Sequence, residues 1–274
     1  MAIIGSRDGT RDRCRPFRDA TRAEYVEELG PDLDAVLVFG GDGTVHRNLA
    51  RLVEANAPVL VVPTGSGNDF ASSLGTGNPR HALKLWRQFV RKPTNVRTID
   101  LGRVTGPSSK HLFCNVANFG LDSEINRLAN LLPRFLRANG GYVLSLFPAL
   151  LKYRAPKVTI RFDDRTIHEA MLLSVAGNGG RYGRGVRIAP HAKMDDGLLD
   201  LCFIRNLSKV KIATIFPVVF LGWHVNLPEV KYARFRRLEI ESEKPVDVYA
   251  DGEYLCRTPA TIEVVPNAMQ VIAP

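Results

Sequence analysis

The feature that most constrains this chain is a short apolar run that ends abruptly in a cluster of glycines. Residues 35–39 are continuously apolar, as expected of a parallel strand that is covered on both faces, and Gly40, Gly41 and Gly43 follow at once. Glycine adopts positive φ readily and has no Cβ to hold a ligand away from backbone N–H groups. The next residues predict a helix over Val45–Ala55 with its N-terminus at the turn, which favours a bound anion such as phosphate.

A second strand and glycine loop repeat this pattern. The segment 58–63 is apolar and runs into Thr64-Gly-Ser-Gly-Asn-Asp-Phe70. Parallel strands end at the same edge of a sheet, so the two loops meet at a crevice of the kind where open α/β sheets bind ligands. A glycine turn without a ligand is the alternative for either loop alone, and the pair of loops makes it the weaker interpretation. A helix over residues 80–91 follows.

The pattern changes at about residue 97 to short β-rich segments, which are often alternating. Strands are predicted at 98–102, 112–118, 157–162, 171–176, 198–204, 237–242 and 246–250. A helical insert over 125–152 interrupts them, and 209–220 is a further candidate helix. We expect an α/β nucleotide-binding domain with a parallel sheet over residues 1–97 and a mainly antiparallel β-sandwich domain over residues 98–264. Residues from about 265 to 274 are candidates to return to the first domain.

The net charge of the chain limits the class of binding partner but does not identify the partner. The 274 residues include 37 Lys and Arg against 28 Asp and Glu, a formal net charge of +9. Such a balance suits nucleic acid, an anionic membrane surface or phosphorylated ligands. The densest basic stretches, 11–22 and 231–237, do not lie on a recognisable nucleic-acid module with interleaved aromatic residues, so no nucleic-acid partner is expected.

Cysteine usage and hydropathy favour a cytoplasmic protein. Cys14, Cys114, Cys202 and Cys256 are far apart and form no Cys-x-x-Cys pair, so neither a metal cluster nor a disulfide framework is expected. The N-terminus has no signal-peptide pattern. The longest uncharged run, 212–228, is shorter and more polar than the ~20 apolar residues that a spanning helix needs. We expect no integral membrane segment and at most a peripheral location at the inner membrane surface.

Acidic residues beside glycine turns and strand ends are the candidates for chemistry. These residues are Asp42, Asp69, Asp100, Asp196, Asp251 and Glu253. Phosphoryl transfer needs Mg²⁺ on carboxylate, carbonyl or water oxygens and a carboxylate that accepts a hydroxyl proton. The alternative for each Asp-Gly pair is a tight turn that closes a hairpin. The histidines show no metal-binding spacing, and the chain has neither a Gly-x-Ser-x-Gly elbow nor a Walker A motif.

The order of motifs is itself informative. They are Gly40-Gly-Asp-Gly-Thr-Val45, Pro63-Thr-Gly-Ser-Gly-Asn-Asp-Phe-Ala71, Asp100-Leu-Gly102, Asn118-Phe-Gly-Leu-Asp122, Ala176-Gly-Asn-Gly-Gly180, Pro190-His-Ala-Lys-Met-Asp-Asp-Gly-Leu-Leu-Asp200 and Asp251-Gly-Glu253. From about residue 35 onward, this series resembles the bacterial diacylglycerol kinase-like lipid kinases, which are related to eukaryotic diacylglycerol and sphingosine kinases. Gly-Gly-Asp-Gly-Thr also occurs in NAD kinases, and Gly-Gly-Asp-Gly in phosphofructokinases. The resemblance implies a first domain like that of those enzymes.

The resemblance also implies a set of site residues. ATP phosphates would lie on the first loop and on the facing residues of the second loop: Gly40, Gly41, Asp42, Gly43, Thr44, Thr64, Gly65, Ser66, Asn68 and Asp69. The Asp196 carboxylate and the carbonyls of Lys193 and Leu198 would hold Mg²⁺, with Asp69 and Asp100 linked to the metal network or supporting it. Asp251 would be the general base that takes the lipid hydroxyl proton, with Glu253 nearby. From the residues alone, Asp42 is an alternative candidate for the general base.

Two departures from the family pattern bear on activity. The family usually places Asn-Glu where this chain has His46-Arg47. That basic pair either adds a phosphate contact or shows that the helix face has drifted, and we slightly favour drift. The family also opens with a strand that ends in an Asn-Pro-x-x-Gly turn, which residues 1–30 do not match. One helix, 18–29, is predicted there, and the first βα unit is expected to be short or lost.

The resulting expectation is an ATP- and Mg²⁺-dependent lipid kinase that converts diacylglycerol to phosphatidate at the membrane surface. The lipid would enter between the domains, along the apolar insert or the segment 212–223. Plain core packing is the alternative for both segments. The rival functions are a kinase for a soluble hydroxyl substrate such as NAD, and a catalytically impaired nucleotide- or lipid-binding relative. Acyl-chain preference is undetermined, and a homodimer is left open.

Overall fold

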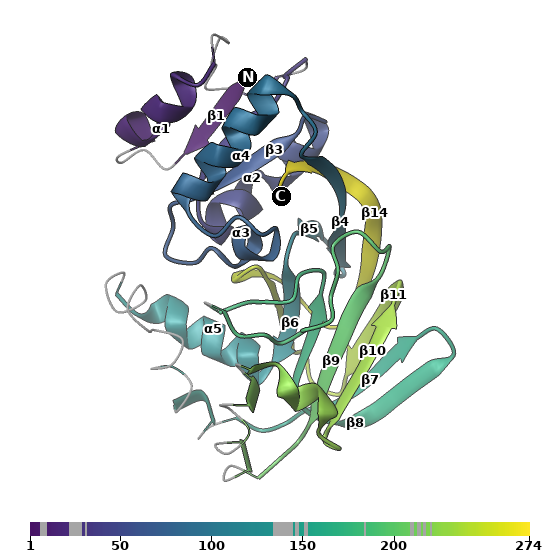
Figure 1. Ribbon diagram of the computed structural model, residues 1–274. Coiled ribbons are helices and arrows are strands. Elements are labelled where there is room, and N and C mark those ends of the chain that lie inside the picture. The colour runs from purple at the N-terminus through teal and green to yellow at the C-terminus, as the bar shows by residue number, and fades with distance from the viewer. Residues whose placement is uncertain are drawn as a thin grey trace.

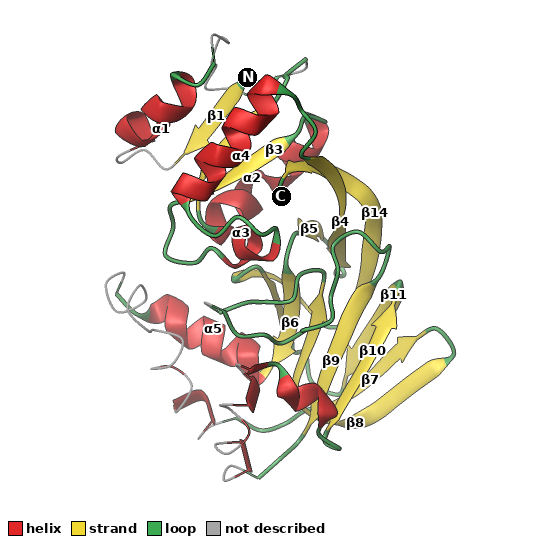
Figure 2. Ribbon diagram, in the orientation of Figure 1, coloured by secondary structure: helices red, strands yellow, loops and turns green. Residues whose placement is uncertain are grey.

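The structure is a computed structural model in which two lobes share one mixed sheet (Figures 1 and 2). It describes residues 1–5, 10–21, 29–30, 32–133, 145, 148–150, 153–183, 185–208, 211–212, 215, 218–219 and 221–274. The strand order is β1-β2-β3-β14-β11-β7-β8-β6-β12-β13, with β4, β5, β9 and β10 attached beside this path. The N-terminal strands are parallel and the C-terminal strands antiparallel, which confirms the mixed α/β and β-sandwich fold expected from the sequence.

The N-terminal lobe is built from βα units. Its elements are β1 (Ala2–Gly5), α1 (Thr10–Arg18), β2 (Val36–Gly40), α2 (Asp42–Glu54), β3 (Val59–Pro63), α3 (Asp69–Ser73) and α4 (Pro79–Arg91). Strand β2 is buried along its whole length, as its continuous apolar sequence predicts. Helices α2 and α3 pack on one face of the parallel strands, and α1 and α4 pack on the other.

The first βα unit is present, and the expectation that it is lost was wrong. Strand β1 pairs in parallel with β2, from Ala2 opposite Val36 to Gly5 opposite Phe39. Helix α1 follows it and buries Phe17 against Phe39, with ring centroids 5.0 Å apart. Four apolar or small residues were too few to stand out in a charged segment. The helix predicted over 18–29 falls largely outside the described residues.

The C-terminal lobe is a two-layered antiparallel structure. Its elements are β4 (Val96–Thr105), β5 (Lys110–Phe113), β6 (Val116–Gly120), α5 (Leu121–Leu131), β7 (Lys157–Phe162), β8 (Arg165–Gly177), β9 (Leu199–Arg205), a 3₁₀ helix η1 (Trp223–Asn226), β10 (Val230–Phe235), β11 (Arg237–Ser242), β12 (Asp247–Ala250), β13 (Glu253–Arg257) and β14 (Ala260–Ile272). Pattern reading missed β10, β13 and most of β14. It also joined β5 and β6 into one strand. Most of the insert and of the 209–220 segment lies outside the described residues.

Strands β4 and β14 connect the two lobes (Figure 1). They pair antiparallel from Thr261 opposite Thr105 to Ile272 opposite Val96, with an irregularity between Val265 and Met269. The end of β14 pairs in parallel with β3, where Val271 lies opposite Val59. The backbone of the C-terminus is therefore hydrogen-bonded into the N-terminal parallel strands.

Candidate active site

The two glycine loops are packed backbone against backbone. A Cβ on Gly41 would lie 2.3 Å from the Gly67 carbonyl oxygen and 3.1 Å from the Gly65 Cα, and a Cβ on Gly65 would lie 2.5 Å from the Gly41 Cα. The Asp42 N–H donates to the Gly67 carbonyl at 3.1 Å. The sequence reasoning assigned these glycines to ligand access. The structure adds a second reason, since side chains at 41 and 65 would force the loops apart.

Asp42 joins the first loop to the second. Its Oδ2 accepts the Asp69 N–H at 3.0 Å, and its Oδ1 accepts the Phe70 N–H at 3.0 Å. Asp42 itself begins α2, three residues before the predicted start, so one carboxylate closes the junction between two helix N-termini. Burial raises the pKa of Asp42 to about 6, although the N–H groups of Phe70 and Asp69 partly oppose the shift.

The remaining residues of the loops are held by local bonds. The Asn68 side chain accepts from the Gly65 N–H at 3.2 Å and donates to the Gly65 carbonyl at 2.9 Å, which closes the second loop on itself. The Thr64 N–H donates to the Gly40 carbonyl at 3.0 Å. Ser66 is exposed at the tip of the loop, and the Thr44 side chain fills the space where a Cβ on Gly40 would lie.

Asp251 occupies a site on the other lobe, at the turn between β12 and β13. Its φ is +50°, and its side chain is fully buried. Oδ1 accepts the N–H groups of Asn115 and Val116 at 3.0 and 3.1 Å, and Oδ2 accepts the Cys114 N–H at 2.8 Å. These donors belong to the short break between β5 and β6 that pattern reading overlooked. Because the break turns successive N–H groups toward one point, it forms a pocket for a carboxylate.

His46 completes the surroundings of Asp251. Its Nδ1 lies 3.3 Å from the Asp251 Oδ2, and its side chain is 11% exposed. Burial alone would raise the pKa of Asp251, but the hydrogen bond and charge of His46, helped by the Cys114 and Val116 N–H groups, hold it below its usual value. Burial alone would lower the pKa of His46, but the Asp251 carboxylate outweighs burial and raises it. The structure places the His46 ring against Asp251, a contact that neither sequence interpretation of His46 included.

Glu253 lies at the rim of this region. Its Oε1 is 3.7 Å from the Arg47 Nη1, and both side chains are about half exposed, at 47% and 64%. It would also lie 3.6 Å from a Cβ on Gly43. Glu253 therefore faces the first loop across the seam between the lobes.

The residues expected to hold Mg²⁺ form a separate cluster. Asp100 is 2% exposed, and its two oxygens accept the Gly197 N–H at 2.7 Å and the Asn267 N–H at 2.8 Å. It thus fastens the loop before β9 to the irregularity in β14. The Asp196 Oδ1 accepts the Leu198 N–H at 3.1 Å, while Lys193 is exposed nearby.

One observation indicates that a magnesium ion would fit this cluster. The Asp196 Oδ2 is buried without a hydrogen-bond partner, and the nearest cation, the Arg234 Nη1, is 3.8 Å away. Burial raises the pKa of the neighbouring Asp200, and the Asp196 charge adds to the shift against the Tyr232 hydrogen bond. Within the described residues, no three His, Cys, Asp or Glu side chains form a ligand set. A metal at Asp196 would therefore rely on main-chain and water oxygens.

A cleft between the lobes brings several of the predicted residues together. Its volume is about 170 Å³, and its wall includes Asp42, Gly67, Asp69 and Asp251, along with Asn115, Asn118 and Tyr182. Asp42 and Asp251 come from different lobes and from positions more than 200 residues apart in the chain. In the described part of the chain, the Asp100 and Asp196 cluster does not line this cleft. Sequence reasoning did not anticipate Cys114 or Asn115 in the site, and it considered His46 only as a phosphate contact or as part of a drifted helix face.

Comparison with known proteins agrees with this architecture. Residues 13–104 match the model of the diacylglycerol kinase catalytic domain, and residues 115–273 match the YegS C-terminal NAD kinase beta sandwich-like domain. A diacylglycerol kinase of Mycobacterium tuberculosis is 35% identical over 249 residues, covering 88% of this chain and 77% of that protein. A probable YegS-like lipid kinase of Chromohalobacter salexigens is 30% identical over 271 residues, covering 96% and 81%.

Solved structures show the same fold. A putative diacylglycerol kinase from Bacillus anthracis superposes with a TM-score of 0.78 at 22% identity, covering 100% of this chain and 97% of that one. An NAD kinase from Archaeoglobus fulgidus in complex with ATP gives a TM-score of 0.58 at 16% identity, covering 99% and 92%. The class of protein is thus a two-lobed kinase of NAD kinase-like fold. The chain belongs to the family of bacterial diacylglycerol kinases and YegS-like lipid kinases, and it is a lipid kinase.

Two further findings bear on the sequence expectations. Membership of a kinase family implies use of ATP, as expected. None of the helices in the described part of the chain has the length and apolar content needed to cross a bilayer.

Proposed function

We propose that this chain transfers the γ-phosphoryl group of ATP to the hydroxyl group of diacylglycerol and forms phosphatidate, with Mg²⁺ as the metal. The observation that carries the proposal is the interlobe cleft. It joins Asp42 and Gly67, from the glycine loops, to the carboxylate region of Asp251. Phosphoryl transfer needs little more from a protein than such a combination of positioning, charge neutralisation and a proton acceptor.

The N-terminal lobe supplies the groups for nucleotide binding. Helix α2 begins at Asp42, and its Gly41 N-cap makes no side-chain capping hydrogen bond, so its positive end is directed at the junction of the loops. The Asp42 carboxylate holds the second loop against the first through Asp69 and Phe70. The phosphates of ATP would lie along the N–H groups of this junction.

The metal cluster and the Asp251 region supply the remaining functions. Asp196, with the carbonyls of Lys193 and Leu198, would hold Mg²⁺, and the bound ion would neutralise charge on the transferred phosphoryl group. Asp100 holds the Asp196 loop in place through the Gly197 N–H. The region of Asp251, His46 and Glu253 would receive the hydroxyl proton.

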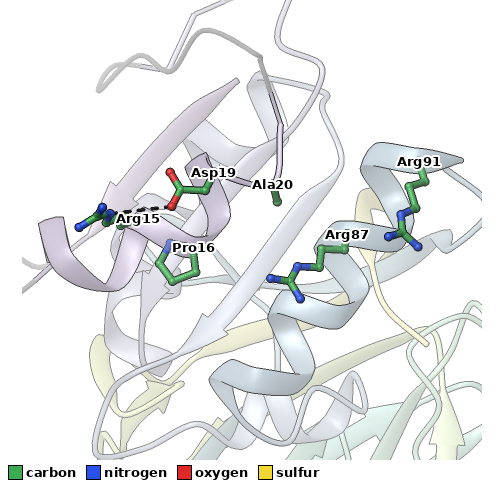
Figure 3. A pocket seen from close by; sticks show the side chains of 6 residues that line it. All are labelled: Arg15, Pro16, Asp19, Ala20, Arg87 and Arg91. Carbon is green, nitrogen blue, oxygen red and sulfur yellow. Dashed lines mark ion pairs between the residues drawn. The ribbon is translucent and has the colours of Figure 1, made fainter.

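Surface charge supports a membrane-borne substrate. The outer face of α4 carries Arg80, Lys84, Arg87 and Arg91, all exposed, and in the described part of the chain none of them pairs with a carboxylate. Figure 3 shows Arg87 and Arg91 of α4 across a pocket from α1, where Arg15 is paired with Asp19 at 3.8 Å. An unpaired basic residue near an anionic bilayer contributes about 1 kcal/mol of binding, which would keep the enzyme at the surface.

The test uses purified protein, γ-labelled ATP, Mg²⁺ and mixed micelles of diacylglycerol, ceramide, sphingosine and monoacylglycerol, with NAD in a parallel reaction without micelles. We expect labelled phosphatidate that disappears when Mg²⁺ is chelated. Label on NAD alone would contradict the lipid assignment. ATP binding without any labelled product would identify a catalytically impaired relative, although the presence of β1 removes the structural argument for that alternative.

A further inference from the structure

One side chain joins the surroundings of Asp251 to the N-terminal lobe. Asn115 lies in the break between β5 and β6, is 3% exposed and forms part of the cleft wall. Its side-chain Oδ1 accepts a hydrogen bond from the Ser73 hydroxyl at 3.2 Å, while its backbone N–H donates to the Asp251 Oδ1 at 3.0 Å. Asn115 is therefore in direct contact with the proposed base and with the last residue of α3.

Helix α3 connects Asn115 to the nucleotide loops. At the first end of the helix, the Asp69 and Phe70 N–H groups each donate to the Asp42 carboxylate of the first loop at 3.0 Å. At the other end is Ser73. A helix of this length spans roughly 7.5 Å at 1.5 Å per residue. Direct contacts thus run from the first glycine loop, along α3, to the residue beside Asp251.

The other hydrogen bonds of Asn115 hold it within the C-terminal lobe. Its carbonyl accepts the N–H groups of Asn178 at 2.9 Å and Gly179 at 2.8 Å, and its Nδ2 donates to the Arg181 carbonyl. A Cβ on Gly179 would lie 1.8 Å from the Asn115 Oδ1, so the side chain occupies space that only a glycine leaves free. This packing gives a structural reason for the Ala176–Gly180 motif, for which the family resemblance implied no role.

We propose that Asn115 is a positioning residue for phosphoryl transfer, and that its hydrogen bond with Ser73 fixes where Asp251 lies relative to the nucleotide loops. This inference rests on the proposed function. The hydroxyl group is activated on one lobe and the γ-phosphate is held on the other, so the reaction depends on how the two lobes are placed. A displacement of about 1 Å in such a geometry can lower a rate by about 10²-fold. Asn115 acts through Asp251 and does not itself take the proton.

Asn115 also supports a second part of the cleft wall. Its bond to the Arg181 carbonyl precedes Tyr182 and Gly183, both of which line the cleft. Two backbone hydrogen bonds between Tyr182 and Val186, at 3.0 and 2.9 Å, close this segment on itself. Loss of the Asn115 side chain should therefore disturb this wall as well as the link to α3, whereas loss of the Ser73 hydroxyl should disturb the link alone.

The primary kinetic test uses Ser73→Ala, which removes the link to α3 and leaves the bonds of Asn115 within its own lobe intact. We expect kcat to fall by about 10-fold, with the KM for ATP unchanged and Tm within about 4 °C of the wild type. Ser73→Thr, which keeps a hydroxyl group, should restore most of the activity. Ser72→Ala is the matched control, since Ser72 is the adjacent residue on α3 and is exposed.

A double-mutant cycle with Asp251→Asn distinguishes positioning of the base from general support of the fold. Ser73→Ala should lower kcat by about 10-fold in the wild type but by less than about 2-fold in Asp251→Asn, where there is no base left to position. A 10-fold loss in both backgrounds would overturn the inference. An unchanged kcat in Ser73→Ala would also overturn it, and a higher KM for ATP without a loss of kcat would assign the bond to nucleotide binding instead.

Asn115→Ala tests both contacts of the side chain together. We expect a fall in kcat of about 10²-fold and a higher KM for diacylglycerol, because the wall at Tyr182 shifts along with the base. Wild-type kinetics in this variant would contradict the role of Asn115. Circular dichroism checks its folding, and Ser73→Ala carries the test by itself if Asn115→Ala does not fold.

Urea unfolding separates this inference from the proposed function, because it needs no assay of activity. Ser73→Ala, Asn115→Ala and the double variant should give non-additive losses in the free energy of unfolding, as expected of two side chains that bond to each other. Additive losses would overturn the inference even in an active kinase. Failure of the wild type to phosphorylate any lipid would overturn the proposed function and the role in phosphoryl transfer, while the unfolding cycle would still decide whether this bond links the lobes.

Discussion

Two aspartates, one on each lobe, line the same cleft in opposite electrostatic settings. Asp42 accepts two N–H groups from the second loop and has no described cationic partner, so burial dominates and raises its pKa to about 6. Asp251 accepts three N–H groups and faces His46, and these donors outweigh burial and lower its pKa. The same residue type therefore serves two purposes, because the surroundings fix the charge of Asp251 and leave that of Asp42 adjustable.

The largest expected effect on activity comes from replacing each of the two carboxylates, in separate variants, by an amide. Asp251→Asn should lower kcat by about 10³-fold or more, because the amide cannot accept the hydroxyl proton and turns an NH₂ group toward backbone N–H donors. Asp42→Asn should lower kcat/KM by roughly 10- to 100-fold, because the two glycine loops would be held together less tightly. Steady-state assays at saturating lipid measure both, and circular dichroism checks folding. Equal losses of activity in the two variants would contradict the proposed difference in function between Asp42 and Asp251.

A pair of glycines on the Asp42 side tests whether the loop contact is structural. Gly41→Ala would place a Cβ 2.3 Å from the Gly67 carbonyl oxygen, whereas the nearest atom to a Cβ on Gly43 is the mobile Arg47 Nη1 at 3.3 Å. We expect Gly41→Ala to weaken ATP binding by roughly 100-fold and to lower Tm, because the backbone must move apart. Gly43→Ala should keep the wild-type Tm. Calorimetry of both variants measures this, and equal Tm values would contradict the loop-contact account.

The pH dependence of stability should distinguish the two aspartates directly. The folded pKa of Asp42, about 6 against 3.8 in a model peptide, means that the folded state holds a proton that the unfolded chain has lost. The Asp42 contribution to the free energy of unfolding is therefore present below pH 4 and lost as pH rises to 6, by about 2 kcal/mol. The Asp251 contribution has the opposite sign, since it is present above its unfolded pKa and lost in acid.

Urea unfolding between pH 4 and pH 7 measures this difference. The fall in stability with rising pH should be absent in Asp42→Asn and present in the wild type. Parallel curves for the two proteins would show that Asp42 titrates normally and would remove the contrast with Asp251.

The smallest expected effect concerns a third carboxylate, at the proposed metal site. Asp196→Asn should raise the Mg²⁺ concentration for half-maximal activity by roughly 10-fold, because one oxygen ligand is replaced by a neutral one. Asp195→Asn is the matched control, since Asp195 is the adjacent residue and is exposed. A titration of activity against Mg²⁺ concentration compares the two variants. Identical curves for the two variants would place the metal away from Asp196.

The sequence by itself determined the parts of the fold that depend on local pattern. The buried strand, the glycine turn and α2 could be predicted because apolar runs, glycines and helical periodicity act over a few residues. The residue order of the motifs also indicated the lipid kinase family. The β1 strand was missed because four residues in a charged segment give a weak signal, and its stability comes from pairing with β2.

Tertiary structure decided how the site is built. The Asp42 carboxylate meets the Asp69 and Phe70 N–H groups 27 and 28 residues away, and Asp251 meets His46 across 205 residues. The break between β5 and β6 has no sequence signal of its own, because it matters only through the carboxylate that its N–H groups surround. The sequence was enough to identify the candidate residue types. Charge and hydrogen bonding act through space, however, so the difference in pKa between Asp42 and Asp251 arises only when the two lobes are assembled.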